Sequence, residues 1–240
     1  MEELKLPVKL KVRLGEFVKG LSDIYSIDLI SVILYGSAAS GEFVDRHSNL
    51  NVLAVLKKAD LLDLKKSAII IKKYPEINAL FFDKNYIISS LDVFPIEFLD
   101  MKENYAVLYG EDLLKDLNID LKNLRFQCEH ELKAKLINLR QSYIKIAKNN
   151  IELKDFLFRS FTSTLHIARN LLRLKGKAPV YSKDEIINDL AKEFLINDEV
   201  WKRLLSAKNK KIEVKPSEID VLFIEFVKEL DNLVSVVDKI

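Results

Sequence analysis

The chain has 240 residues, of which 38 are Lys or Arg and 36 are Asp or Glu, so its net charge is +2. This balance argues against the broad basic surface that marks a nucleic-acid-binding protein. The single cysteine excludes an intrachain disulfide and a cysteine metal cluster. No apolar run reaches the ~18 residues of a membrane helix, and the N-terminal residues lack the apolar core of a signal peptide. We therefore expect a cytoplasmic protein.

Apolar spacing predicts a mixture of helices and strands in the first half of the chain. Helices are predicted over 6–24 and 60–73, and strands over 29–34, 50–56, 78–82 and 96–99. The small residues 36–41 form a turn or the start of a short helix, and 105–109 is a short extended piece. Glu111 and Asp112 carry charges that suit the start of a brief helix.

After about residue 118 the strand signals stop. Long amphipathic helices are predicted over 123–148 and 153–174. Ser182 is predicted to cap a third helix and Pro216 to begin the last one. The expected fold class is therefore α+β, with a small mixed-sheet domain over residues 1–118 and an antiparallel helical bundle over 119–240.

The segment from Leu34 to Leu53 carries the most functional information. Gly36 and Ser37 directly follow the first predicted strand, and Asn49 and Asn51 stand at the start of the second. A glycine lets the backbone approach a phosphate closely, and a serine hydroxyl with nearby amides can point at anionic oxygens. Taken alone, a Gly-Ser turn after a buried strand is more often a structural device than a binding site.

This arrangement, with Gly-Ser after one strand and two spaced polar residues at the start of the next, resembles the signature of the nucleotidyltransferase superfamily related to DNA polymerase β. The whole layout looks like the small kanamycin nucleotidyltransferase-like proteins, in which a helical, HEPN-like substrate-binding domain follows the catalytic domain. The resemblance implies transfer of a nucleoside monophosphate from a nucleoside triphosphate, with magnesium held by an Asp-x-Asp and a third acid. By that resemblance Gly36 and Ser37 bind the nucleotide, Asn49 and Asn51 occupy the two aspartate positions, and Glu97 is the third acid.

Magnesium prefers anionic oxygen ligands, and an amide oxygen cannot offset the charge of two closely spaced ions. We therefore predict a degenerate member of this family, a pseudoenzyme that binds a nucleotide, a protein partner or a second copy of itself. Two alternatives stay open. One is an active magnesium-dependent transferase that uses Glu97 and an unrecognised acid such as Asp45. The other is an interaction module of a toxin–antitoxin-like pair. Membranes and nucleic acid are not expected partners.

Several other polar residues have a structural and a functional interpretation. Alternation on the predicted 96–99 strand places Glu97 opposite its apolar neighbours, in the active cleft or in solvent. Arg125 and His130 have the spacing of an RNase motif, which we interpret as coincidence. The remaining candidates are interpreted as solvated, packed or ligand-lining residues: Glu42, Asp45, His47, Asp92, Arg159, His166, Arg169, Arg173, Lys175 and Lys177. Cys128 is expected to pack as a small apolar residue.

Overall fold

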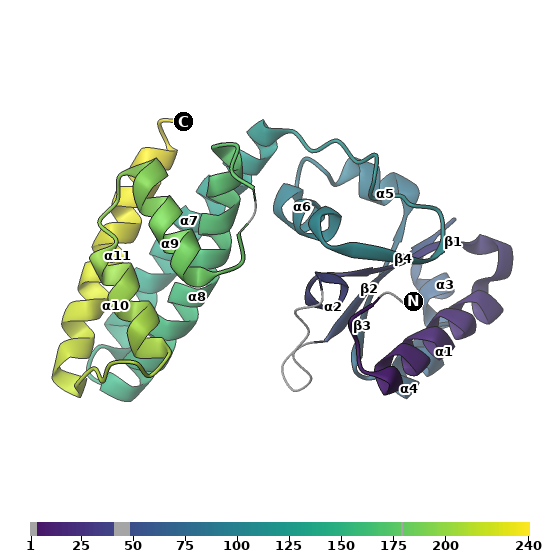
Figure 1. Ribbon diagram of the computed structural model, residues 1–240, viewed down its shortest axis with the longest axis horizontal. Coiled ribbons are helices and arrows are strands. Elements are labelled where there is room, and N and C mark those ends of the chain that lie inside the picture. Colours follow the sequence, from purple (N-terminus) through teal and green to yellow (C-terminus); the bar gives the residue numbers. More distant parts are fainter. Residues whose placement is uncertain (1–3, 41–48, 179) are drawn as a thin grey trace. The chain divides into compact units, whose positions relative to one another are not determined.

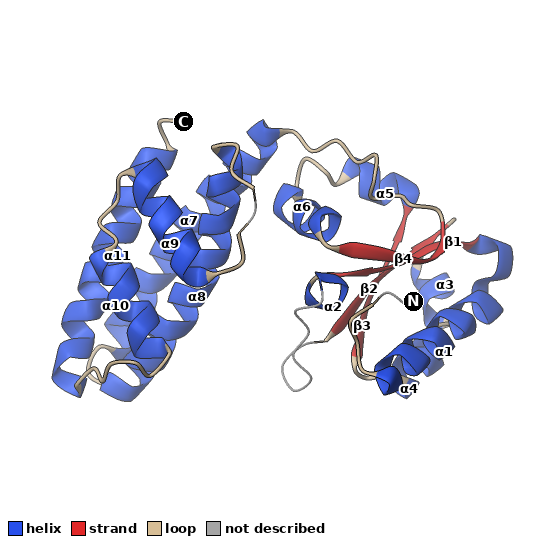
Figure 2. Cartoon of the chain, in the orientation of Figure 1, coloured by secondary structure: helices blue, strands red, loops and turns tan. Residues whose placement is uncertain are grey.

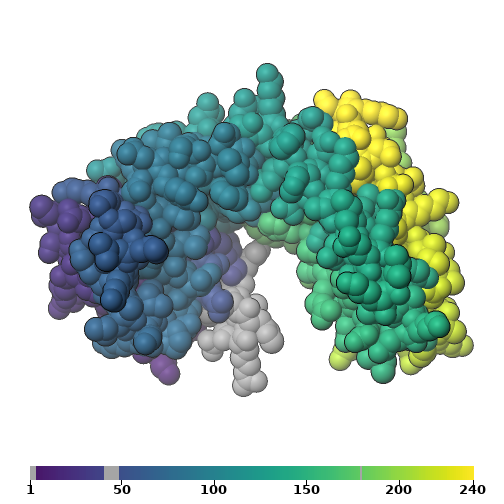
Figure 3. All heavy atoms as spheres, turned by 180° about the vertical axis from the view of Figure 1, so that it is seen from behind, coloured from purple at the N-terminus to yellow at the C-terminus, as the bar shows by residue number. Residues whose placement is uncertain are grey.

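The computed structural model describes residues 4–40, 49–178 and 180–240. The chain divides into two compact units, Met1–Asp120 and Leu121–Ile240. The first combines helices with a sheet and the second is entirely helical in its described residues, which confirms the predicted α+β fold class (Figures 1 and 2). Figure 3 shows one face of each unit with all heavy atoms drawn as spheres. Within the described residues, no helix combines the length and the apolar character needed to cross a lipid bilayer.

A four-stranded mixed sheet of order β3-β2-β1-β4 organises the first unit. Its strands are β1 (Leu29–Tyr35), β2 (Leu50–Leu56), β3 (Ile77–Asp83) and β4 (Tyr105–Gly110). β2 runs parallel to β3, whereas β1 is antiparallel to both β2 and β4. As a result, the C-terminal end of β1 meets the N-terminal ends of the other three strands at one edge of the sheet.

Helices cover both faces of this sheet (Figure 1). α1 (Val8–Tyr25) and α4 (Ala68–Lys73) pack on the face that buries Val32, Leu34 and Val52. α5 (Lys84–Ser89) and α6 (Pro95–Glu103) pack on the face that buries Ile33, Leu53 and Val55. Because both faces are buried, the central strands are almost continuously apolar, which is why the sequence predicts them well.

Three predicted elements of the first unit differ from the structure. Helix 60–73 is broken into α3 (Leu61–Lys65) and α4, and at the break the Ser67 hydroxyl lies 2.6 Å from the Tyr25 hydroxyl. The predicted fourth strand, 96–99, is wrong, because these residues belong to helix α6, which has Pro95 in its first turn. The fourth strand is instead β4, which the sequence showed only as a short extended piece.

The brief helix predicted from Glu111 is also wrong. Asp112 instead accepts hydrogen bonds from the Tyr105 hydroxyl at 3.0 Å and from the Lys115 amide at 3.1 Å. A short carboxylate side chain that bonds nearby backbone in this way favours a turn over a helix.

The second unit is a helical bundle. Its helices are α7 (Leu121–Ile146), α8 (Asn150–Leu174), α9 (Lys183–Phe194), α10 (Glu199–Lys208) and α11 (Pro216–Val237). α7 and α8 pack together, and α11 packs on both. Phe161, Trp201 and Phe226 form an aromatic cluster in the core, with ring centroids 5.6–6.1 Å apart. α10 was not predicted from the sequence.

Candidate functional site

The turn between β1 and α2 (Ser37–Ser40) is built around Gly36. Gly36 has a φ of +77°. Residues other than glycine adopt this backbone conformation only at a cost in free energy. Its amide donates to the Asn104 carbonyl at 2.9 Å, and its carbonyl accepts from the Ala39 and Ser40 amides at 2.9 and 3.1 Å. These bonds fix where the turn leaves the sheet and where Ser37, which is half-buried, begins α2.

Asn51 lies directly beside this turn. A Cβ atom on Gly36 would stand 3.4 Å from Asn51 Nδ2, so the glycine allows the amide side chain to lie close to the backbone. Asn51 also pairs with Tyr35 across β1 and β2. Burial raises the pKa of the Tyr35 phenol, so this neighbour stays uncharged.

A third amide, Asn78, completes the cluster and was not singled out from the sequence. Asn78 pairs with Asn51 in the parallel register of β2 and β3, and its Nδ2 donates to Asn51 Oδ1 at 3.3 Å. Asn49 is exposed just before β2, two residues before Asn51 in the chain. The only sequence signal for Asn78 is that an asparagine stands at the start of an apolar strand, as Asn51 does.

The amide side chains described at this edge of the sheet do not supply the anionic oxygens that magnesium ions prefer. Asn49, Asn51 and Asn78 are all neutral, and Asn51 Oδ1 already accepts a hydrogen bond from Asn78. Two divalent ions ~4 Å apart repel each other by roughly 16 kcal/mol at an effective dielectric constant of about 20, a repulsion that carboxylates normally offset. Among the described residues, no group of three His, Cys, Asp or Glu side chains is arranged to hold a metal ion.

Glu97 requires a correction. It is an exposed residue in the first turn of α6, not a residue of a strand at this edge of the sheet. The predicted position of Glu97 on a strand is therefore wrong. Asp92 is exposed in the segment before α6, and Glu42, Asp45 and His47 lie outside the described residues.

A cavity of about 410 Å³ lies at the opposite ends of the strands from the amide cluster. It is lined by α5, which follows the C-terminal end of β3, and by residues 111–118, which follow β4. With strands of six or seven residues and ~3.3 Å per residue, the two ends of the sheet are about 20 Å apart. This cavity is therefore separate from the Gly36 turn.

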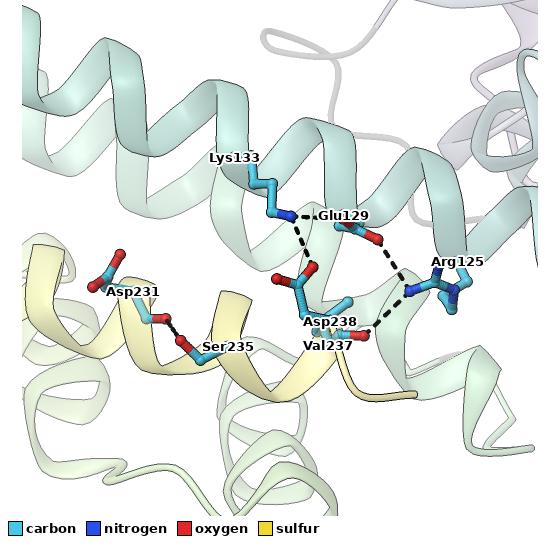
Figure 4. A network of polar contacts seen from close by, with 7 residues as sticks. All are labelled: Arg125, Glu129, Lys133, Asp231, Ser235, Val237 and Asp238. Carbon is cyan, nitrogen blue, oxygen red and sulfur yellow. Dashed lines mark hydrogen bonds and ion pairs between the residues drawn. The ribbon is translucent and has the colours of Figure 1, made fainter.

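Arg125, singled out in the second unit for its spacing from His130, has structural partners. Arg125 forms an ion pair with Glu129 at 3.0 Å and donates to the Val237 carbonyl at 3.5 Å, as Figure 4 shows. His130 is exposed five residues further along α7, about 140° around the helix from Arg125.

The basic residues at the end of α8 are also engaged within the second unit. Arg169 lies 4.7 Å from the centre of the Tyr181 ring, and Arg173 is buried and donates to Asn170. Lys175 lies over the Phe194 ring at 5.5 Å, and Lys177 pairs with Glu193 at 3.0 Å. Arg159 and His166 are exposed.

Comparison with solved structures finds the same fold in a crystal structure of spectinomycin adenyltransferase AAD(9) from Enterococcus faecialis with ATP and spectinomycin. The two chains are 15% identical, with a TM-score of 0.59, and the match covers 92% of this chain and 99% of the other. The predicted nucleotidyltransferase fold is thereby confirmed. No protein-family model and no curated protein matches the sequence.

Proposed function

We propose that this protein binds a nucleoside triphosphate at the Gly36–Ser37 turn and does not carry out magnesium-dependent nucleotidyl transfer. The observation that carries the proposal is the pair of hydrogen-bonded neutral amides, Asn51 and Asn78, beside that turn, with Asn49 two residues before Asn51 in the chain. A structure with the same fold contains ATP, which supports a nucleotide as the ligand.

The turn has the chemistry to receive a phosphate. The first amides of a helix have no acceptor within the helix, so those of Ser37 and Ala38 suit an anionic oxygen. The Ser37 hydroxyl adds another donor. Amide side chains at the same edge can donate to phosphate oxygens, which carboxylates cannot do. Replacing Asp by Asn also removes negative charges that would repel a triphosphate lacking its metal.

Replacing the three asparagines by aspartates tests whether the neutral amides are the reason that magnesium does not contribute to ATP binding. We expect the wild-type protein to release no pyrophosphate from ATP in magnesium. We expect the N49D/N51D/N78D variant to bind ATP at least about tenfold more tightly with magnesium than without it, because the new carboxylates supply anionic ligands. Asn85→Asp, at an exposed position of α5 at the other end of the sheet, is the matched control and should behave like the wild type.

A second substitution tests the phosphate contact itself. Ser37→Ala should weaken ATP binding by about tenfold, the effect of one hydrogen bond to a charged group. Ser89→Ala, whose hydroxyl bonds the Tyr86 carbonyl at 3.2 Å, should leave ATP binding unchanged. Magnesium-dependent release of pyrophosphate by the wild type would instead establish an active transferase. Absence of ATP binding in every condition would favour an interaction module.

A further inference from the structure

A second candidate site lies within the helical unit, between α10 and α11. It is a cavity of about 320 Å³ to which α10 contributes Glu199, Val200 and Arg203, and α11 contributes Glu225, Lys228 and Glu229. This volume lies at the lower end of the range for small-molecule sites. None of these residues belongs to the Gly36 turn or to the amide cluster.

Glu229 is the unusual member of this site. Its side chain is only 9% exposed, and its Oε1 accepts a hydrogen bond from Asn232 Nδ2 at 3.4 Å. Its Oε2 is buried and has no hydrogen-bond partner in the described part of the chain. A buried carboxylate oxygen without a donor is unfavourable. Because Glu229 is also a lining residue of the cavity, a hydrogen-bond donor that enters the cavity would satisfy this oxygen.

The charges around the cavity favour a cationic donor. Three carboxylates face two basic side chains, which leaves the lining with a net charge of −1 (two minus three). Arg203 forms ion pairs with Glu218 at 3.0 Å and with Glu225 at 3.9 Å. Its guanidinium therefore pairs with acids other than Glu229. Lys228 is exposed at the rim.

We propose that this cavity binds a small organic ammonium ion whose N–H donates to Glu229 Oε2. The last torsion of a glutamate is broad, so a modest rotation can turn Oε2 into the cavity. Val200 offers an apolar surface to the methylene groups of the ligand. A metal ion fits less well, because no described group of three acids or other metal-binding side chains is arranged for one. An ammonium ion needs fewer acceptors.

Thermal unfolding of the full-length protein with 1,4-diaminobutane as the probe tests this site. We expect the diamine to raise the Tm of the wild type, because a ligand that binds only the folded state stabilises it. The uncharged analogue 1,4-butanediol should leave the Tm unchanged. Glu229→Gln should weaken diamine binding by about tenfold or more, as expected for loss of a charge-assisted hydrogen bond.

Asp231→Asn is the matched control, because Asp231 lies on the same helix and pairs with Arg140 at 3.1 Å, outside the cavity. It should retain the full response to the diamine. Glu229→Gln keeps the size of the side chain and replaces an oxygen that has no hydrogen-bond partner, so its Tm without ligand should not fall. The proposal is overturned if the wild type does not respond to the diamine, if the diol has the same effect, or if Glu229→Gln and the wild type respond equally.

Discussion

Gly110 ends β4 with a φ of +73°, and its neighbours leave no room for a side chain. A Cβ atom there would lie 1.9 Å from the Ile30 carbonyl oxygen. Gly110→Ala should therefore lower the free energy of unfolding by about 3 kcal/mol, through backbone strain and steric overlap together. Gly176 has a similar φ of +69° but nothing within 4 Å of a Cβ.

Gly176→Ala is thus a control for strain alone and should cost about 1 kcal/mol. Urea unfolding of both variants gives the comparison. Equal losses of stability in the two variants would show that the contact with Ile30 is not what makes Gly110 necessary.

Cys128 is fully buried on α7, and burial raises the pKa of its thiol to about 12. We expect Ellman's reagent at pH 8 to label it only when the protein is unfolded, since the thiolate is the reactive form. The raised pKa means that the folded state holds the proton more tightly than the unfolded state. The associated stability is present below the ordinary thiol pKa of about 9 and is lost as the pH rises toward 12. Rapid labelling of folded protein at pH 8 would contradict this.

The residues of the candidate site were predictable in part. Gly36, Ser37, Asn49 and Asn51 stand next to strong strand signals, and the sequence fixes their order along the chain. The proximity of Asn78 to Asn51 depends on the parallel register of β2 and β3, which no local pattern reveals. Pairing between strands far apart in sequence is therefore the information that sequence reasoning lacked.

Element prediction failed where an apolar run was short. Residues 95–99 suit a strand or a helix equally in their periodicity. In the structure Pro95 lies in the first turn of α6, where its missing N–H costs nothing, and Ile96, Phe98 and Met101 are buried. Packing of this helix on the sheet therefore decided between the two conformations and removed Glu97 from the strand expected to carry it.

The C-terminal end of α11 is tied to α7 by the ion pair between Lys133 and Asp238 (Figure 4). Lys133 lies 2.7 Å from Glu129 and 2.8 Å from Asp238. Lys133→Ala should therefore accelerate amide hydrogen exchange in the last turn of α11, whereas Arg140→Ala, which loses a pair with Asp231 earlier in the helix, should not.

The pH dependence of this contact has a definite sign. The Lys133 ammonium lowers the pKa of the Asp238 carboxyl. The stabilisation is thus present above the ordinary carboxyl pKa and is lost as the pH falls through the lowered value. If Lys133→Ala and Arg140→Ala left exchange in this turn equally unchanged, the ionic contacts would not hold it.

At the scale of the whole molecule, the first half of the sequence has strand and helix signals and the second half has helix signals alone. This change predicted that the sheet precedes the bundle. The long helices were visible because each has an apolar stripe that repeats over several turns. We propose that the bundle folds on its own, since its core is contained within residues 121–240. A fragment of these residues should be helical and unfold cooperatively on heating. A fragment without a cooperative transition would show that the first unit is needed for its folding.

Calorimetric titration of the wild-type protein with ATP, in magnesium and again in EDTA, tests the central claim most directly. The neutral amides at Asn49, Asn51 and Asn78 predict that ATP binds in both conditions, with affinities that differ by less than about threefold. Binding that requires magnesium would contradict the account, because it would mean that this edge of the sheet still assembles a metal site.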